Sequence, residues 1–325
     1  MLENGNTIGE PKDGILKKQG EKMTIGIPRA LLYYRYQYLW KTFFTRLGCN
    51  VVISAPTSQN MLARGIALSV GECCLPVKIF MGHVASLLGR CDYILIPRFE
   101  TLGKGEEFCV RFWGLPDIVH NTFPDAPILS YNLQDHKRGS EMQGFLQMGL
   151  RLGKSPAQTV AAYRRGVQEQ LRQDCLVREK QELLLAASGL KVLFAAQSYL
   201  IHDGYVGAPL IRMIEEQGGV PVFADRCDPM TCRASAKTLS QDLYWTVNKE
   251  IIGAIPLTKK EVDGVLLITA FPCGTDSLVN ELVLRRVRDI PIAQIVLDEQ
   301  QGESGLQTRM ECFMDILSER RRSHA

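Results

Sequence analysis

The residues best able to do chemistry in this chain are its ten cysteines. Cys273 directly follows the apolar run VLLITAF and begins CGTDSLVNELVLRR, whose pattern predicts a helix. A thiol at a helix start feels the positive end of the helix dipole, which lowers its pKa and favours the metal-binding thiolate. Cys74 precedes a predicted helix with Pro76 in its first turn. Cys109 lies in KGEEFCVRFWGLPD, which has no clean period and is predicted to be a functional loop.

Three thiolates from three separate segments suit two kinds of metal site. One is an iron–sulfur cluster with one iron left for another ligand, and the other is zinc with three cysteines and one further ligand. The spacing of Cys74, Cys109 and Cys273 matches neither a compact ferredoxin nor a zinc ribbon, so spacing does not choose between them. For each cysteine taken singly, an inert buried thiol is the competing interpretation.

The other cysteines carry weaker signals. Cys73 neighbours Cys74, and adjacent side chains seldom face one ligand, so one of the pair is predicted to be structural. Cys227 and Cys232 form a C-x₄-C pair after the predicted strand VPVFAD, which is a partial ligand motif only. These three are secondary candidate ligands. The remaining four are predicted to be core thiols: Cys49, Cys91, Cys175 and Cys312.

Two further side chains lie near these motifs. His83 falls within a predicted helix and is interpreted as a satisfied, partly buried group. Lys78 is four residues after Cys74, so its ammonium would lie near that thiolate, unless it is simply solvated. We find no G-x-G-x-x-G, Walker A or G-x-S-x-G sequence, which disfavours a self-contained ATPase or nicotinamide enzyme.

The elements that must position these residues alternate between continuous apolar strands and amphipathic helices, as in parallel sheets covered on both faces. We therefore predict an α/β fold of two parallel-sheet, Rossmann- or flavodoxin-like lobes joined by helices. The predicted divisions are a flexible tail (1–22), an N-terminal lobe (23–134), a helical bridge (135–189) and a C-terminal lobe (190–325). Within the last, residues 234–253 are predicted to be helical, with Gly253 and Pro256 ending the helix. Ligands of such sheets bind beyond the carboxyl ends of the strands, so Cys74, Cys109 and Cys273 should meet between the lobes.

The composition narrows the class of protein. Hydrophobic residues make up 46% and charged residues 22% of 325 residues, which excludes a disordered chain. The net charge of +3 gives no reason to expect nucleic acid or an anionic membrane as partner. The polar N-terminus has no apolar segment typical of an export signal, so we expect a cytoplasmic protein with reduced thiols.

Several sequence blocks resemble one known family. The first runs from Glu72 through Cys74 and Pro76 to Lys78, followed by Gly82-His83-Val84 and by the strand from Asp92 to Pro97. FPCGTDSL and VLDEQQGESGLQTRMECFMD follow in the C-terminal part. Together, over about residues 23–317, they resemble the 2-hydroxyacyl-CoA dehydratase superfamily, most closely the branch associated with ATP-dependent activases. Where that family has D-E-H, this chain has Asp298-Glu299-Gln300, and any proton transfer by the histidine is absent.

The resemblance implies an oxygen-sensitive iron–sulfur redox protein of anaerobes. An ATP-hydrolysing activase would supply low-potential electrons, and the substrate would be a small molecule or an acyl-CoA, as for an oxidoreductase or a lyase. Carried onto this chain, the cluster ligands would be Cys74, Cys109 and Cys273, holding a 4Fe–4S cubane or part of an 8Fe–9S double cubane. A non-catalytic electron relay or cluster carrier, and a zinc-binding or metal-free α/β binding domain, remain alternatives. Homodimer and heterodimer are both open.

Overall fold

The computed structural model describes residues 21–134, 140–300 and 302–324, with the strands mainly in two parallel sheets. The first sheet contains β1 (Thr24–Ile27), β2 (Asn50–Ile53), β3 (Tyr93–Leu95) and β6 (Ile128–Leu129) in the order β2-β1-β3-β6. The second contains β8 (Leu190–Ala195), β9 (Gly219–Phe223), β10 (Gly264–Ala270) and β11 (Ile292–Leu297) in the order β11-β10-β8-β9. Both sheets thus place their first strand between the second and the third. The predicted α/β class with two parallel-sheet lobes is confirmed.

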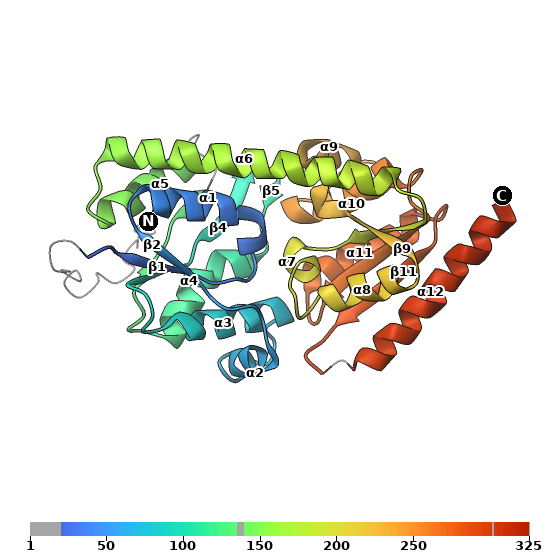
Figure 1. The fold of residues 1–325 in the computed structure, drawn as a ribbon, viewed down its shortest axis with the longest axis horizontal. Helices are drawn as coiled ribbons and strands as arrows, with labels where there is room; N and C mark the ends of the chain where they lie inside the picture. The colour runs from blue at the N-terminus through green and yellow to red at the C-terminus, as the bar shows by residue number, and fades with distance from the viewer. Residues whose placement is uncertain (1–20, 135–139, 301, 325) are drawn as a thin grey trace, which may run out of the picture.

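The helices surround these sheets (Figure 1). In the N-terminal part they are α1 (Tyr33–Arg46), α2 (Gln59–Ala67), α3 (Leu75–Leu87), α4 (Val110–Thr122), α5 (Ser140–Arg151) and α6 (Pro156–Ala186). In the C-terminal part they are α7 (Ser198–Ile201), α8 (Ala208–Glu216), the short 3₁₀ turn η1 (Ala224–Arg226), α9 (Pro229–Ala236), α10 (Thr246–Thr258), α11 (Gly274–Arg286) and α12 (Glu303–His324). None of the helices in the described ranges is both long and apolar enough to cross a membrane.

Local sequence accounts for several of these elements. Ser58 accepts a hydrogen bond from the Met61 amide and begins α2, as its position predicts. Ser155 and Gln158 form a capping box at the start of α6, and Pro156 stands at the first helical position. Every residue of β10 is buried, as expected of a central strand covered on both faces.

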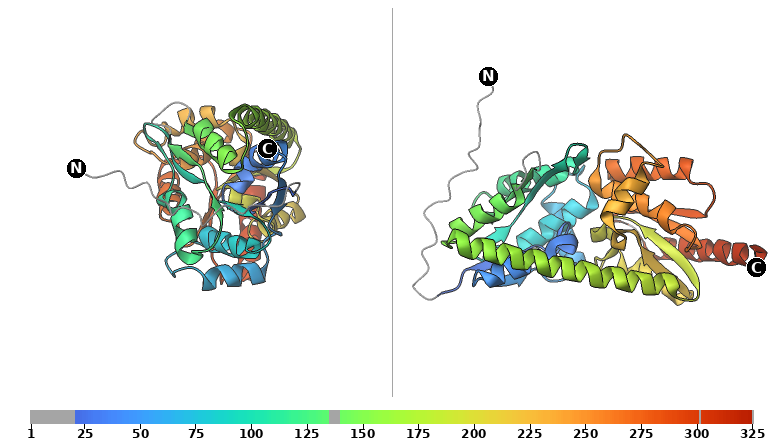
Figure 2. Two further views of the ribbon diagram at one scale, coloured as in Figure 1. Left: turned by 90° about the vertical axis from the view of Figure 1, so that its left-hand side faces the viewer. Right: turned by 90° about the horizontal axis from the view of Figure 1, so that it is seen from above.

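Helix α6 joins the two lobes along one side of the molecule (Figures 1 and 2). In the first lobe it packs on α1, where Gly166 allows close approach to Leu39. In the second lobe Gln181 exchanges two hydrogen bonds with the backbone of Phe223, at the end of β9. The division of the chain into domains at residues 135 and 190 stays a prediction, and residues 1–20 of the predicted tail lie outside the described residues.

Two segments differ from the prediction. The segment KGEEFCVRFWGLPD (104–117), predicted to be a functional loop, contains β5 (Glu106–Glu107) and most of α4, and it follows β4 (Arg98–Gly103). Strands β5, β4 and β7 (Asn132–Gln134) form a small third sheet, and Pro116 within α4 hid the helical pattern. The predicted helix over 234–253 is instead the pair α9 and α10, and both Gly253 and Pro256 lie inside α10. Gly253 is there because α9 approaches so closely that a Cβ would clash with the Cys232 carbonyl.

Helices α2 and α3 are packed backbone to backbone through two glycines. A Cβ on Gly65 would clash with the Lys78 carbonyl oxygen, and one on Gly82 would clash with the Met61 carbonyl oxygen. Because backbone atoms cannot move aside as a side chain can, the interface requires glycine at both positions.

The Gly65→Ala variant is therefore expected to be less stable by about 2 kcal/mol, the overpacking penalty less the gain in helix propensity. Gly114, a glycine inside α4, is the matched control because its nearest neighbouring atom would lie in ordinary contact with a Cβ. Urea denaturation of both variants checks this. A Gly65→Ala protein as stable as Gly114→Ala would contradict the close packing of α2 on α3.

A buried polar network crosses from the first lobe to the second around His83. Ser54 donates to His83 Nδ1 at 2.7 Å, and His83 Nε2 lies 3.0 Å from the Thr57 hydroxyl. Thr57 in turn donates to Asp203 of the second lobe. A neutral imidazole satisfies all these bonds, and burial lowers the pKa of His83 to about 4. His83 is thus a satisfied group, as predicted, but fully buried and part of the lobe interface.

Candidate functional site

The three cysteines singled out by sequence line one cavity between the lobes. The cavity has a volume of about 30 Å³. Each cysteine is the residue that caps the start of a different helix: Cys74 precedes α3, Cys109 precedes α4 and Cys273 precedes α11. The structure therefore brings the three thiols together, although their role as metal ligands stays a prediction.

Three helix N-termini facing one cavity make it favourable for negative charge. The first backbone amides of a helix have no partner within the helix, and the helix dipole adds a partial positive charge there. The first turns of α3 and α4 carry no acidic residue, and that of α11 carries only Asp276. The partial positive charge at these helix N-termini is thus little neutralised by acidic side chains of the first turns. It can stabilise an anionic group bound at the thiols.

The position of the cavity follows from the strand order. In each sheet the chain leaves the first and third strands in opposite directions, which opens a crevice beyond their carboxyl ends. Gln197 follows the first strand of the second sheet, β8, and Cys273 follows its third strand, β10. Leu31 follows the first strand of the first sheet, β1. All three line the cavity, which therefore lies where the crevices of the two sheets face each other.

A buried carboxylate organises the polar part of the cavity. Gln197 Nε2 and Asn248 Nδ2 both donate to Asp276 Oδ1, at 3.0 and 2.7 Å. Burial raises the pKa of Asp276, while these two amides favour its ionised form. Both amides line the cavity, so Asp276 holds them in place from behind. Of these residues only Asp276 lies in a block that the sequence marks, FPCGTDSL. Gln197 could have been found from its position two residues after the end of β8, whereas nothing in the sequence around Asn248 marks that residue.

The expectation that a helix start lowers the pKa of the Cys273 thiol is wrong for the metal-free protein. Burial raises the pKa of Cys273 to about 12, and the nearby charge of Asp276 adds to this. Burial likewise raises the pKa of Cys74 to about 11 and raises that of Cys109. The free thiols are therefore protonated at neutral pH, and binding a metal would release protons.

Lys78 is not solvated, and its ammonium has a carboxylate partner. Its side chain is buried, and its ammonium forms a 2.7 Å ion pair with Glu299 of the segment after β11. The backbone amide of Leu75 also donates to the Phe271 carbonyl of the second lobe, at 3.0 Å. The start of α3, next to Cys74, is thus tied to the second lobe by two contacts.

The secondary candidates do not line this cavity. Cys73 is buried in the hydrophobic core. Cys232 lies on α9 and is buried in the core of the second lobe, and Cys227 packs against the same core. Of the four predicted core thiols, Cys49 is buried and Cys91 is half-buried. Cys175 and Cys312 are exposed, because they face outward on α6 and α12, and the prediction for them is wrong.

No single-ion site is formed by the part of the chain that the structure describes. There, no group of three or more histidine, cysteine, aspartate or glutamate side chains is arranged to hold one metal ion. Cys74, Cys109 and Cys273 line one cavity, but within the described ranges they do not form such a group.

Comparison with known families adds a further finding. No curated protein matches the chain. A family model described as "CoA enzyme activase uncharacterised domain (DUF2229)" matches residues 24–226, which is more than half of the sequence and includes Cys74 and Cys109 but not Cys273. This agrees with the resemblance to activase-associated, dehydratase-related proteins, without identifying a particular member. With the fold and the matched region taken together, the chain belongs to this family of domains linked to CoA enzyme activases.

Proposed function

We propose that this protein is an iron–sulfur redox protein of an ATP-dependent activase system, with Cys74, Cys109 and Cys273 as the cluster ligands. One observation carries the proposal: three cysteines, each at the start of a different helix, line a single cavity between two lobes. No compact sequence motif brings them together, because they come from three separate loops of the fold.

The donor set suits a cluster better than a single ion. Zinc requires its ligands to converge within about 2.3 Å of one point. In a cubane each thiolate binds a different iron, so the sulfurs stand apart around a common volume. Three thiols from three loops around a shared cavity suit the second arrangement. They would leave one iron without a cysteine ligand.

The chain's own residues provide the surroundings of such a group. When bound, the cluster would supply one-electron reduction and an open iron at which a ligand can be polarised. The N-termini of α3, α4 and α11 stabilise the negative charge of a thiolate-bound cluster. Gln197 and Asn248, held by Asp276, present fixed amide groups to a ligand in the same cavity. Catalytic residues in the strict sense are not assigned.

An activase is the proposed electron donor. The matching family is described by its link to CoA enzyme activases. Exposed apolar side chains also stand beside two of the cysteines: Val110 directly follows Cys109, and Phe271 is two residues before Cys273. Both side chains would be accessible to a protein partner that docks over these cysteines. The electron acceptor is a small molecule or an acyl-CoA, and the reaction is a reduction or a reductively started elimination.

Anaerobic purification tests the cofactor. We expect a brown protein with close to four irons and four sulfides per chain if one cubane is bound. About twice as many irons would indicate a double cubane. Zinc, or no metal at all, would refute the proposal and leave a zinc-binding or metal-free binding domain.

Turnover tests the role. With a purified activase and ATP, we expect the cluster absorbance to bleach on reduction and to return when a substrate is added. Bleaching that depends on ATP but is reversed only by a second protein would identify an electron relay. No ATP-dependent bleaching would refute the link to an activase.

A further inference from the structure

A second cavity of about 260 Å³ lies beside the first, between α9, α10 and strand β5. Its charged and polar lining consists mainly of Glu106, Arg233, Lys237, Ser240, Gln241 and Lys249. Three of these side chains are cationic and only one is anionic. The exposed Met230 lies at its edge, so the cavity is open to solvent.

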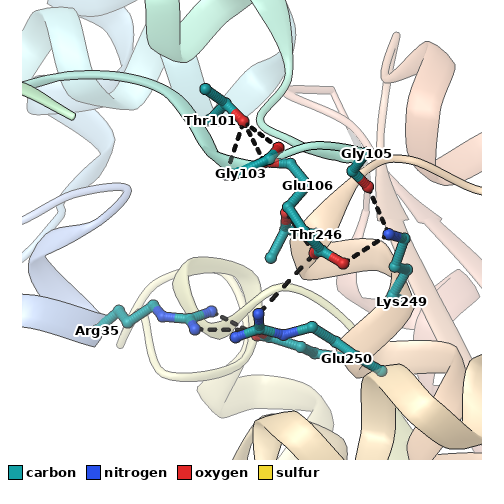
Figure 3. A network of polar contacts seen from close by, with 9 residues as sticks. Arg35, Thr101, Gly103, Gly105, Glu106, Thr246, Lys249 and Glu250 are labelled. Atoms are coloured by element: carbon teal, nitrogen blue, oxygen red, sulfur yellow. Dashed lines mark hydrogen bonds and ion pairs between the residues drawn. The ribbon is translucent and has the colours of Figure 1, made fainter. Parts of the chain in front are cut away.

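The single carboxylate in this cavity belongs to an interaction that joins the two lobes (Figure 3). Glu106 Oε1 accepts a hydrogen bond from Lys249 Nζ at 2.8 Å, and Glu106 Oε2 accepts one from the Thr246 hydroxyl at 3.0 Å. Lys249 also donates to the Gly105 carbonyl at 2.6 Å. The β4–β5 hairpin of the first lobe is thereby held on α10 of the second.

The Arg233 guanidinium makes a hydrogen bond to Glu250 but none to Glu106. Its Nε donates to Glu250 at 3.0 Å, and Glu250 also receives a bidentate pair from Arg35 of α1. Its Nη1 lies 3.9 Å from Glu106 Oε2, beyond hydrogen-bonding distance. In this position the Glu106 carboxylate hydrogen-bonds to Lys249 and forms only a long ion pair with Arg233. A tetrahedral oxyanion has acceptor oxygens in more directions and can bind both cations at once.

Strand β5 forms a wall between the two cavities. Side chains alternate along a strand, so Glu106 lines the second cavity while Glu107 lines the cavity of the three cysteines. The Glu107 amide donates to the Tyr244 carbonyl at 2.8 Å, and Glu107 pairs with Trp245. Any change in how Glu106 is held therefore acts on a strand that contacts the candidate redox site.

We propose that the second cavity binds a phosphate group, which replaces the Glu106 carboxylate on Lys249 and engages Arg233, and so releases β5 from α10. The phosphate could be inorganic or part of a larger molecule, because the cavity is open at one side. Binding does not require a cluster, so this site stands independently of the proposed redox function.

Binding is tested on the full chain by calorimetry with three probes: inorganic phosphate, ADP and coenzyme A. In the Lys249→Gln variant we expect about ten-fold weaker binding, as for loss of one charge-assisted hydrogen bond. In Glu106→Gln, which removes the competing charge but keeps the shape, we expect about five-fold tighter binding. The source of the phosphate is identified by the probe that binds most tightly and whose affinity changes as expected in both variants.

Lys180, an exposed lysine on α6, provides the matched control. Lys180→Gln should bind every probe as the unmodified protein does. Absence of binding by all three probes overturns the proposal. So does binding that is equal in Lys249→Gln and Lys180→Gln, or that is no tighter in Glu106→Gln.

Hydrogen exchange tests the release of β5. Without phosphate, the Glu107 amide is protected by its bond to Tyr244. With the bound probe, we expect faster exchange in peptides covering residues 104–109 and unchanged exchange in β10. Unchanged or slower exchange over residues 104–109 would overturn the coupling between phosphate and the strand.

Discussion

The Cys273→Ser variant is expected to lose nearly all of its iron and its visible absorbance while keeping its fold. Serine is close to cysteine in volume, so the packing around it changes little. The backbone of the turn is held without the sulfur: the Cys273 amide donates to the Ala270 carbonyl at 2.7 Å, and the Cys273 carbonyl accepts from Ser277. A serine hydroxyl stays protonated near neutral pH and is a poor ligand for a soft metal. Iron analysis, the visible spectrum and far-UV circular dichroism of anaerobically purified protein measure the effect.

Cys175→Ser is the control, because Cys175 is exposed on α6 and lies outside the cavity. It should retain the iron of the unmodified protein. If both variants hold the same amount of iron, Cys273 is a buried thiol without a metal, and the proposed redox site loses the ligand contributed by the second lobe.

Acid is expected to destabilise the protein through His83. Burial lowers the pKa of His83 to about 4, against about 6.5 in an unfolded chain. Between these values the unfolded chain binds a proton that the folded protein does not, so the free energy of unfolding falls as the pH falls. The stability present above pH 6.5 is lost towards pH 4, by about 3 kcal/mol in total. The nearby charges act in opposite senses on this histidine, Asp203 raising its pKa and Arg29 lowering it.

Urea denaturation between pH 7 and pH 4.5 measures this loss. In His83→Gln the free energy of unfolding should depend less on pH, because the number of protons taken up on unfolding falls by close to one over this range. In the control His120→Gln, which alters an exposed histidine of α4, the dependence should match that of the unmodified protein. Equal slopes in the two variants would show that His83 is not the neutral group that joins the lobes.

The sequence was informative wherever one local pattern determined an element. Apolar strands such as β10, and caps such as Ser58 and Ser155, depend on neighbouring residues alone, and the structure agrees with them. The same holds for the position of Cys273 between a strand and a helix. Cys74, Cys109 and Cys273 line one cavity, as expected of three thiols on separate loops in a family that the sequence resembles.

The features that the sequence did not predict depend on contacts between distant segments. The helix after Cys109 contains Pro116, and its first turn is placed by the third sheet, so local periodicity missed it. Lys78 was expected near Cys74 because they are four residues apart, but its partner Glu299 comes from the far end of the chain. The pKa of Cys273 was predicted in the wrong direction because helix position can be read from sequence, whereas burial depends on the whole fold.

The division of the cysteines between the lobes has a consequence for the order of synthesis. Cys74 and Cys109 leave the ribosome early, whereas about half the chain's length separates Cys109 from Cys273. The cavity is complete only once β10 and α11 have folded, so the proposed cofactor shared by all three would be inserted after most of the chain has been made. On that proposal, the newly made protein would hold these three thiols empty and protonated for a time. Their raised pKa values suit this waiting state, because neutral thiols neither repel one another nor react readily.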